Sequence, residues 1–196
     1  MQTRLRSVGG AVLTESNDRV WVFGYGSLIW RPDFPFADRR RASISGWSRR
    51  FWQGSHDHRG VPGAPGRVVT LIPDPAGHCD GIAYLVEHGV FDHLDHREKN
   101  GYERFDVTLR FEGGSGAAGV VYIAPAANHA YLGPAPLAEM AQQVLTSRGP
   151  SGDNAEYLYA LAHALRELDA DDQHVFELET LVRSLAVNGH PPAART

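Results

Sequence analysis

The chain has 196 residues, of which 42% are apolar and 21% are charged, and this composition is that of an ordinary globular protein with one substantial core. The formal net charge is −4 and the basic runs at 39–41 and 49–50 are short, which argues against a nucleic-acid partner. The single cysteine, Cys79, excludes an intramolecular disulfide and favours a reducing compartment, and we find no apolar stretch of the length of a signal peptide or a membrane span.

Strand patterns dominate the first part of the chain. We expect residues 1–18 to be a flexible leader. Six segments after it are rich in β-branched and aromatic residues: 20–24, 42–53, 67–72, 81–86, 104–111 and 118–123. The last two flank the sequence EGGSGAA, which predicts a hairpin. The polar, Gly- and Pro-rich segment 54–66 predicts a long loop, and such loops in compact domains are often functional.

Helix patterns dominate the last part. Apolar residues recur at helical spacing in three segments, and a shorter helix interrupts the strands: 136–147, 151–168, 171–186 and 88–97. Asp153 and Glu156 have the spacing of a capping box. We expect residues 188–196 to be a flexible tail, so that a single domain spans 19–187. Strands followed by helices predict an α+β fold, with a curled or closed sheet and helices at one end.

The stretch VFGYGSLIW, residues 22–30, places a glycine-rich bend directly after a buried strand. Gly24 and Gly26 let the backbone come close to a ligand, and successive N–H groups in such a bend can bind an anion. The spacing matches neither the dinucleotide-binding motif nor the P-loop. A tight turn between core segments is the simpler interpretation, but a turn wrapped in apolar residues leaves N–H groups unpartnered unless a ligand binds them.

A second candidate is the glutamate in HLDHREKNGY, residues 93–102. If the short predicted helix forms, Glu98 lies on the same face as Leu94 and points inward, and Gly101 ends the helix in the left-handed conformation. Burial and the negative end of the helix dipole both raise the pKa of this carboxyl, which suits a general base. The alternative is an exposed ion pair between Glu98 and a neighbouring basic residue.

Three other chemistries have weaker support. Two histidine pairs could ligate a metal, His56 with His58 and His93 with His96. The chain has no HExxH motif and no cysteine cluster, so we expect no metal site. Ser27 could be a nucleophile, but GYGSL differs from the GxSxG elbow of serine hydrolases. Cys79 is expected in the turn DPAGHCDG and belongs to no catalytic motif.

Five segments together resemble one family, the ChaC-type γ-glutamylcyclotransferases, which act on glutathione. They are VFGYGSLIW (22–30), RRFWQGSHDHRGVPGAPGRVVTL (49–71), REKNGY (97–102), YLGPAPL (131–137) and GPSGDNAEYL (149–158). They follow the order of the family over about residues 20 to 185, so the resemblance is long and specific. The chain departs from the family in its N-terminal leader and in EHGVFDHLDH before Glu98, which leaves the helix boundaries around 87–97 open.

The resemblance implies a small mixed β-barrel with flanking helices, no cofactor, and a cytosolic location. It implies that glutathione, a small-molecule substrate, is bound by the loop Gly24, Tyr25, Gly26, Ser27, Leu28 and Ile29, with a further contact from Tyr157. It also implies that Glu98 is the catalytic acid and base. We expect no nucleic-acid or membrane partner.

These implications agree with the chemistry of the residues. The bend can donate hydrogen bonds to a γ-glutamyl group, whose own α-amine attacks the γ-carbonyl carbon to close a lactam. One carboxylate can move the protons, so the reaction requires no metal, nucleotide or covalent intermediate. Three alternatives stay open: a cyclotransferase for another γ-glutamyl amine or peptide, a hydrolase that releases glutamate, and a non-catalytic γ-glutamyl-binding module.

Overall fold

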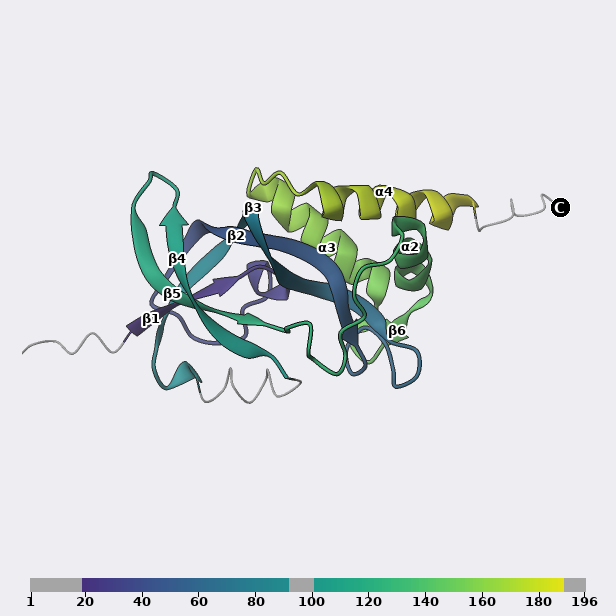
Figure 1. Cartoon of the computed structure of the whole chain (residues 1–196), viewed down its shortest axis with the longest axis horizontal. Coiled ribbons are helices and arrows are strands. Elements are labelled where there is room, and N and C mark those ends of the chain that lie inside the picture. Colours follow the sequence, from purple (N-terminus) through teal and green to yellow (C-terminus); the bar gives the residue numbers. More distant parts are fainter. Residues whose placement is uncertain (1–18, 92–100, 189–196) are drawn as a thin grey trace, which may run out of the picture.

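The structure is a computed structural model that describes residues 19–91 and 101–188. The predicted leader, residues 92–100 and the predicted tail after Asn188 lie outside the described residues. The described chain places a β-barrel at one end and helices at the other (Figure 1).

The strands are β1 (Arg19–Gly24), β2 (Asp38–Ser55), β3 (Gly66–Glu87), β4 (Glu103–Phe111), β5 (Gly116–Ile123) and the short β6 (Arg148–Gly149) and β7 (Gly152–Asp153). The helices are the 3₁₀ turn η1 (Ser27–Ile29), α2 (Leu137–Thr146), α3 (Asn154–Glu167) and α4 (Gln173–Asn188). All of the predicted strands and the three predicted helices after residue 130 have counterparts among these elements.

The long strands close into a barrel in the order β1-β3-β2-β4-β5. β1 pairs antiparallel with β3 on one side and parallel with β5 on the other, which closes the sheet. Val22, Ile82, Leu109 and Val121 are at most 1% exposed and belong to the core around the barrel sheet, where they cover both of its faces. The predicted α+β fold with a closed sheet is therefore confirmed.

One long strand replaces two of the predicted strands. Segments 67–72 and 81–86 both belong to β3, and Cys79, which was expected in a turn, lies within the ladder between β2 and β3. The turn-forming residues 74–77 make a bulge in this ladder, where the Asp74 carboxylate accepts a hydrogen bond of 2.6 Å from a serine hydroxyl of β2. The sequence pattern predicted a turn here and not a bulge through which the strand continues.

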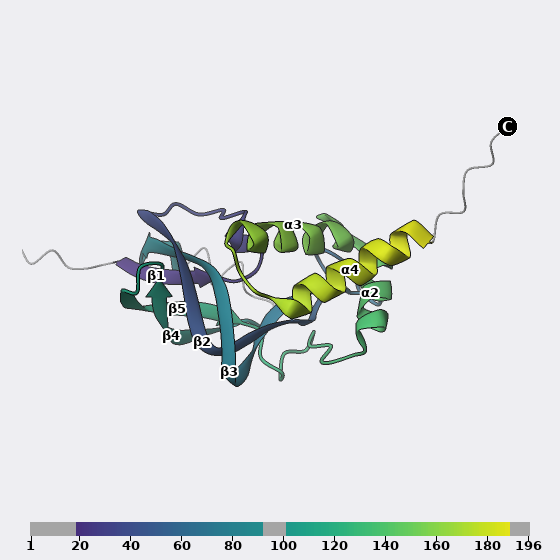
Figure 2. The ribbon, with the colours of Figure 1, turned by 90° about the horizontal axis from the view of Figure 1, so that it is seen from above.

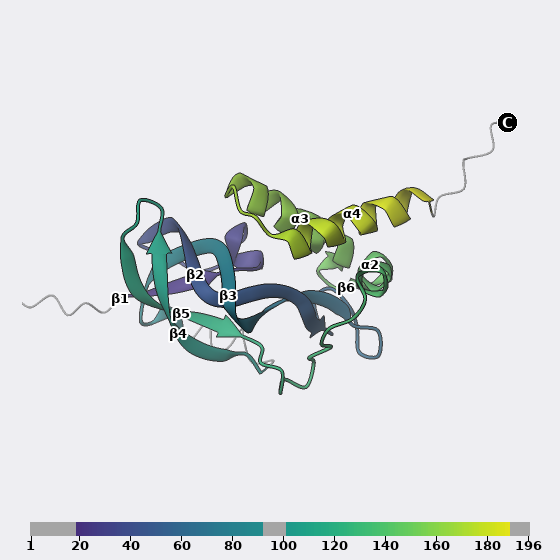
Figure 3. The ribbon, with the colours of Figure 1, turned by 45° about the horizontal axis from the view of Figure 1, so that its top comes forward.

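Helices α2, α3 and α4 lie together beyond the barrel, against the far part of the β2–β3 hairpin (Figures 2 and 3). Most residues of the apolar stripes predicted for α3 and α4 are fully buried: Leu158, Leu161, Leu165, Val175, Leu178 and Val182. The last residue of each predicted stripe, Leu168 and Leu185, is half-buried against the same core. Within the described residues, no helix has the length and apolar character needed to cross a membrane.

Helix α3 begins at Asn154, three residues later than predicted, because β6 and β7 pair as a short hairpin just before it. The predicted capping box is wrong. Asp153 is the N-cap residue, but its carboxylate pairs with Arg148 at 3.2 Å and makes no cap hydrogen bond. Glu156 pairs with Arg59 at 3.3 Å. Arginines from neighbouring segments therefore hold both carboxylates that the motif would have used.

Candidate functional site

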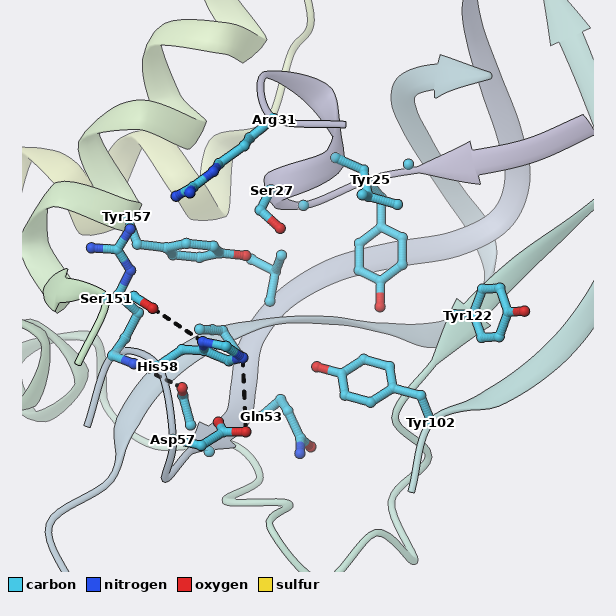
Figure 4. Close-up of a pocket in the computed structure, with 18 of the residues that line it drawn as sticks. Tyr25, Ser27, Arg31, Gln53, Asp57, His58, Tyr102, Tyr122, Ser151 and Tyr157 are labelled. Atoms are coloured by element: carbon cyan, nitrogen blue, oxygen red, sulfur yellow. Dashed lines mark hydrogen bonds and ion pairs between the residues drawn. The ribbon is translucent and has the colours of Figure 1, made fainter. Parts of the chain in front are cut away.

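A cavity of about 520 Å³ lies where the bend after β1, the end of β2 and the start of α3 meet (Figure 4). The predicted functional loop contributes residues 54–59 to its wall. Residues from β3, from β5, from the segment that precedes β4 and from the loops around 30–33, 129–130 and 151 also line it.

Most of the predicted substrate-contact residues meet in this cavity. Those that line it are Gly24, Tyr25, Gly26, Ser27, Leu28 and Tyr157. Ile29 is not among the lining residues, because its side chain is 3% exposed and packs in the core. The shared cavity supports a role in binding for the first six, and that role stays a prediction.

The carbonyl groups of residues 25–29 in the bend all have donors. The pairs are Tyr25 O with Arg49 Nε (2.8 Å), Gly26 O with Ile29 N–H (3.0 Å), Ser27 O with Arg31 N–H (2.8 Å), Leu28 O with the Tyr84 hydroxyl (2.7 Å) and Ile29 O with Arg39 Nη2 (3.3 Å). In contrast, the N–H groups of Gly26, Ser27 and Leu28 have no acceptor in the part of the chain that the structure describes. A bend with occupied carbonyls and available amides is suited to binding an anion.

Gly26 and Tyr157 are direct neighbours. A Cβ atom on Gly26 would lie 3.1 Å from the Tyr157 hydroxyl oxygen and 3.2 Å from Cγ2 of Val69. The Tyr157 ring is held by edge-on contacts with Trp30 and Phe51, with ring centroids 5.6 and 6.0 Å apart. Glycine at this position therefore keeps the backbone of the bend open to the cavity beside a fixed phenol.

Sequence reasoning did not single out several other polar residues of the cavity, among them Gln53, Tyr102 and Tyr122. In Figure 4 the side chains of Tyr25 and Tyr102 both point into the cavity, with Tyr122 beside them. Gln53 had a usable signal, because a polar residue at an inward position of a buried strand is unusual. Tyr122 had none, because only the closure of the barrel brings β5 to this site.

Charged and polar residues surround the cavity rim. Nδ1 of His58 lies 3.1 Å from the Ser151 hydroxyl, and Nε2 lies 3.8 Å from an Asp57 carboxylate oxygen. Ser151, His58 and Asp57 thus have the composition of a Ser–His–Asp triad. However, the His58 side chain is 68% exposed and the carboxylate is too distant for a hydrogen bond, so this group does not activate the serine.

The metal hypothesis gains no support from the described residues. Among them, no group of three or more His, Cys, Asp or Glu side chains is placed to hold a metal ion. His56 and His58 both line the cavity, while His93 and His96 lie outside the described residues. The expected lack of a metal stays a prediction.

Neither alternative nucleophile has an activating environment in the described chain. Cys79 is 1% exposed, and burial raises the pKa of its thiol to about 11, so the thiol is protonated at neutral pH. Ser27 lines the cavity, but no described histidine or carboxylate accepts a hydrogen bond from its hydroxyl.

Glu98, the predicted acid and base, lies outside the described residues. The chain is described again from Gly101 onward, and there it reaches the cavity. Gly101 has φ +80°, as predicted for a left-handed position, and its carbonyl accepts a hydrogen bond of 2.8 Å from Asn128. Tyr102, four residues after Glu98 in the sequence, lines the cavity.

Comparison with known proteins adds independent information. A sequence profile of the ChaC-like protein family matches residues 20–185. Gamma-glutamylcyclotransferase 2-3 of Arabidopsis thaliana is 42% identical over 179 residues, which cover 85% of this chain and 89% of that protein. Glutathione-specific gamma-glutamylcyclotransferase 1 of Homo sapiens is 42% identical over 166 residues, or 80% of this chain and 75% of the human protein. The crystal structure of a γ-glutamyl cyclotransferase specific to glutathione from yeast matches with a TM-score of 0.81 at 32% identity, covering 86% of this chain and 97% of that one.

Proposed function

This chain belongs to the ChaC-like family, and from that premise we propose that it is a γ-glutamylcyclotransferase that converts glutathione to 5-oxoproline and Cys-Gly. The observation that carries the proposal is the bend in the cavity, whose carbonyls are occupied and whose amides are available. The human and yeast relatives are both named as specific to glutathione, which supports the choice of substrate.

The bend binds the α-carboxylate of the γ-glutamyl group. Its N–H groups are preorganised donors, and the surrounding apolar residues exclude water, which strengthens each hydrogen bond to a charged oxygen. The Tyr157 hydroxyl lies beside the bend, at the edge of the same binding surface. This arrangement fixes the α-carbon and thereby positions the α-amine, which is attached to the same atom.

The reaction is an intramolecular displacement at the γ-carbonyl carbon. The α-nitrogen forms a bond to that carbon, which closes a five-membered lactam, and the amide bond to cysteine breaks. Because the nucleophile is tethered to the electrophile, correct positioning replaces much of the activation that a free amine would need. Donors in the cavity stabilise the negative charge that develops on the γ-oxygen.

Two proton transfers accompany the bond changes. The α-ammonium loses a proton before it can attack, and the departing cysteine nitrogen gains one. We assign both transfers to Glu98, for the reasons given by the sequence and because Tyr102, shortly after it, lines the cavity. The protein thus needs no group beyond its own residues for this chemistry. We also propose a cytoplasmic location, which the single free thiol of the chain supports.

Product analysis in oxygen-18 water tests the proposed reaction. Purified protein incubated with glutathione is expected to release Cys-Gly and unlabelled 5-oxoproline, because no water enters the product. A hydrolase would instead give labelled glutamate, and a binding module would leave glutathione intact while still binding it. The same assay with other γ-glutamyl amines distinguishes a glutathione enzyme from a cyclotransferase with a different leaving group.

The role of Glu98 is tested by Glu98→Gln, which keeps the shape of the side chain but cannot accept a proton. We expect kcat to fall by about 100- to 10,000-fold while thermal unfolding stays near that of the wild type. Glu103→Gln is the matched control, because Glu103 is an exposed glutamate near the start of β4. Normal turnover by a folded Glu98→Gln protein would show that another group moves the protons.

A further inference from the structure

Gln53 lies near the end of β2, in the wall of the cavity, and is 1% exposed. Its side-chain nitrogen Nε2 donates a hydrogen bond of 3.1 Å to Oδ1 of Asn128. Its side-chain oxygen Oε1 is buried and has no hydrogen-bond partner in the described part of the chain. A buried acceptor in this state is uncommon in folded proteins and costs free energy unless a ligand or water binds it.

Two backbone groups fix the orientation of the Asn128 amide, and the Asn128 amide in turn fixes that of Gln53. Oδ1 of Asn128 also accepts a hydrogen bond of 2.8 Å from the Ala130 N–H, and Nδ2 of Asn128 donates at 2.8 Å to the Gly101 carbonyl. Reversing the Asn128 amide would break both contacts. Reversing Gln53 would bring its oxygen against Oδ1 of Asn128, so Oε1 must be the atom without a partner.

The cavity wall therefore combines donors in the bend with a fixed, uncharged acceptor on Gln53. The donors are the amides of the bend, which suit a carboxylate. A γ-glutamyl group carries two kinds of donor, the three N–H groups of its α-ammonium and the single N–H of the scissile amide. The α-ammonium is the group that most needs an acceptor, because a buried cation without hydrogen bonds is costly.

We propose that Oε1 of Gln53 accepts a hydrogen bond from the α-nitrogen of the substrate and orients it for attack on the γ-carbonyl carbon. This inference rests on the proposed function, because it takes a γ-glutamyl group as the ligand. An amide oxygen suits the task better than a second carboxylate would. A carboxylate beside the ammonium would favour its charged form and oppose the deprotonation that the reaction requires.

The test measures binding with two unreactive analogues of glutathione. In both, CH₂ replaces the scissile carbonyl, and only one of them carries the α-amino group. Neither can form a lactam, so calorimetric titration of the intact protein reports affinity whether or not the protein turns over glutathione. We expect Gln53→Met to weaken the amino analogue about tenfold or more and to leave the des-amino analogue nearly unchanged.

Two further variants separate hydrogen bonding from packing. Gln53→Glu, protonated in this buried position, can donate to Asn128 and still present a carbonyl oxygen to the ligand, so we expect it to keep the preference for the amino analogue at mildly acid pH. Gln143→Met is the matched control, because Gln143 is hydrogen-bonded to Arg67 and Pro65 and is not a lining residue of the cavity. We expect it to leave both affinities unchanged.

The outcomes distinguish this inference from the proposed function. If a folded Gln53→Met protein lost affinity equally for both analogues, Oε1 would contact another part of the ligand. If it lost affinity for neither, Oε1 would not contact the ligand. Either result would overturn the inference. Selective loss of the amino analogue by a protein that does not cyclise glutathione would support the inference and refute the proposed reaction.

Discussion

At the scale of single residues, the glycines of the bend are required by the contacts around them. A Cβ atom on Gly24 would lie 2.7 Å from Cβ of Leu28, and one on Gly26 would press on Tyr157 and Val69. The sequence predicted this bend because the signal is local, a strand followed at once by two glycines. It did not predict which residues face the bend, since Val69 and Tyr157 are distant in sequence.

The contacts of Gly26 give a test of the binding site. In Gly26→Val the branched side chain would stand where the backbone meets the ligand, and it would displace the Tyr157 hydroxyl, 3.1 Å from the added Cβ. We expect glutathione analogues to lose at least about tenfold in affinity by calorimetry, with a modest loss of stability of about 1 to 3 kcal/mol from overpacking.

Gly89→Val is the matched control for this substitution. Among the described residues, a Cβ on Gly89 meets nothing within 4 Å, and its φ lies outside the positive range that L side chains avoid. We expect it to leave affinity unchanged. Wild-type affinity in a folded Gly26→Val protein would mean that the bend is only a turn between core segments.

At the scale of elements, one buried arginine joins the bend, the barrel and the start of α4. The Arg49 side chain is 1% exposed and donates to the Tyr25 carbonyl of the bend at 2.8 Å, to the Asp172 carboxylate at 2.6 Å, and to the Asp80 carbonyl of β3. The position of the bend therefore depends on a contact with the segment that begins α4.

Replacing Arg49 should strongly destabilise the folded state. In Arg49→Met the Asp172 carboxylate loses its partner and two backbone carbonyls lose their donor, so we expect the free energy of unfolding to fall by about 3 to 5 kcal/mol in urea titrations. Arg19→Met is the control, because the Arg19–Glu87 pair is 3.6 Å long and 49% and 73% exposed. We expect that change to cost less than about 1 kcal/mol, and similar costs for both variants would contradict this account.

The elements also show how far sequence patterns reach. Period and composition located β1, the β4–β5 hairpin and the stripes of α3 and α4, because these depend on neighbours along the chain. These patterns failed where the boundary of an element depends on a partner that is distant in sequence. The strand β3 continues past its bulge because β2 pairs on both sides of it, and α3 starts late because β6 and β7 pair first. The cavity itself could be predicted only through its bend, since most of its wall is assembled by barrel closure.

At the scale of the whole molecule, the helices are attached to the barrel by hydrogen bonds as well as by apolar packing. The Asn154 side chain, fully buried at the start of α3, accepts from the Arg67 N–H at 2.6 Å and donates to the Arg67 carbonyl at 2.7 Å. At the start of α4, Nε2 of His174 accepts a hydrogen bond of 3.1 Å from the Phe51 N–H of β2. Both contacts satisfy strand groups at the junction of the two parts.

The contact to Phe51 requires a neutral imidazole, because a protonated His174 has no lone pair to accept with. Burial, followed by the charge of Arg50, lowers the pKa of His174 from 6.5 to about 4, although Asp172 and Glu177 act in the opposite direction. In the unfolded chain this histidine titrates near its ordinary value. Between these two pKa values the unfolded state binds more protons than the folded state, so stability must fall as the pH decreases through this window.

We therefore expect the attachment of α4 to the barrel to make the whole molecule acid-sensitive. From pH 6.5 down to about 4, His174 contributes a loss of up to about 3 kcal/mol in the free energy of unfolding.

Because carboxylates titrate in the same range, the measurement compares the wild type with His174→Gln, whose amide oxygen can accept from the Phe51 N–H without titrating. Urea unfolding at pH 7, 5.5 and 4.5 should show the wild type losing stability more steeply than the variant. His163→Gln is the control, because His163 is 75% exposed, and its profile should follow that of the wild type. Parallel profiles for the wild type and His174→Gln would show that this histidine does not set the acid limit of the fold.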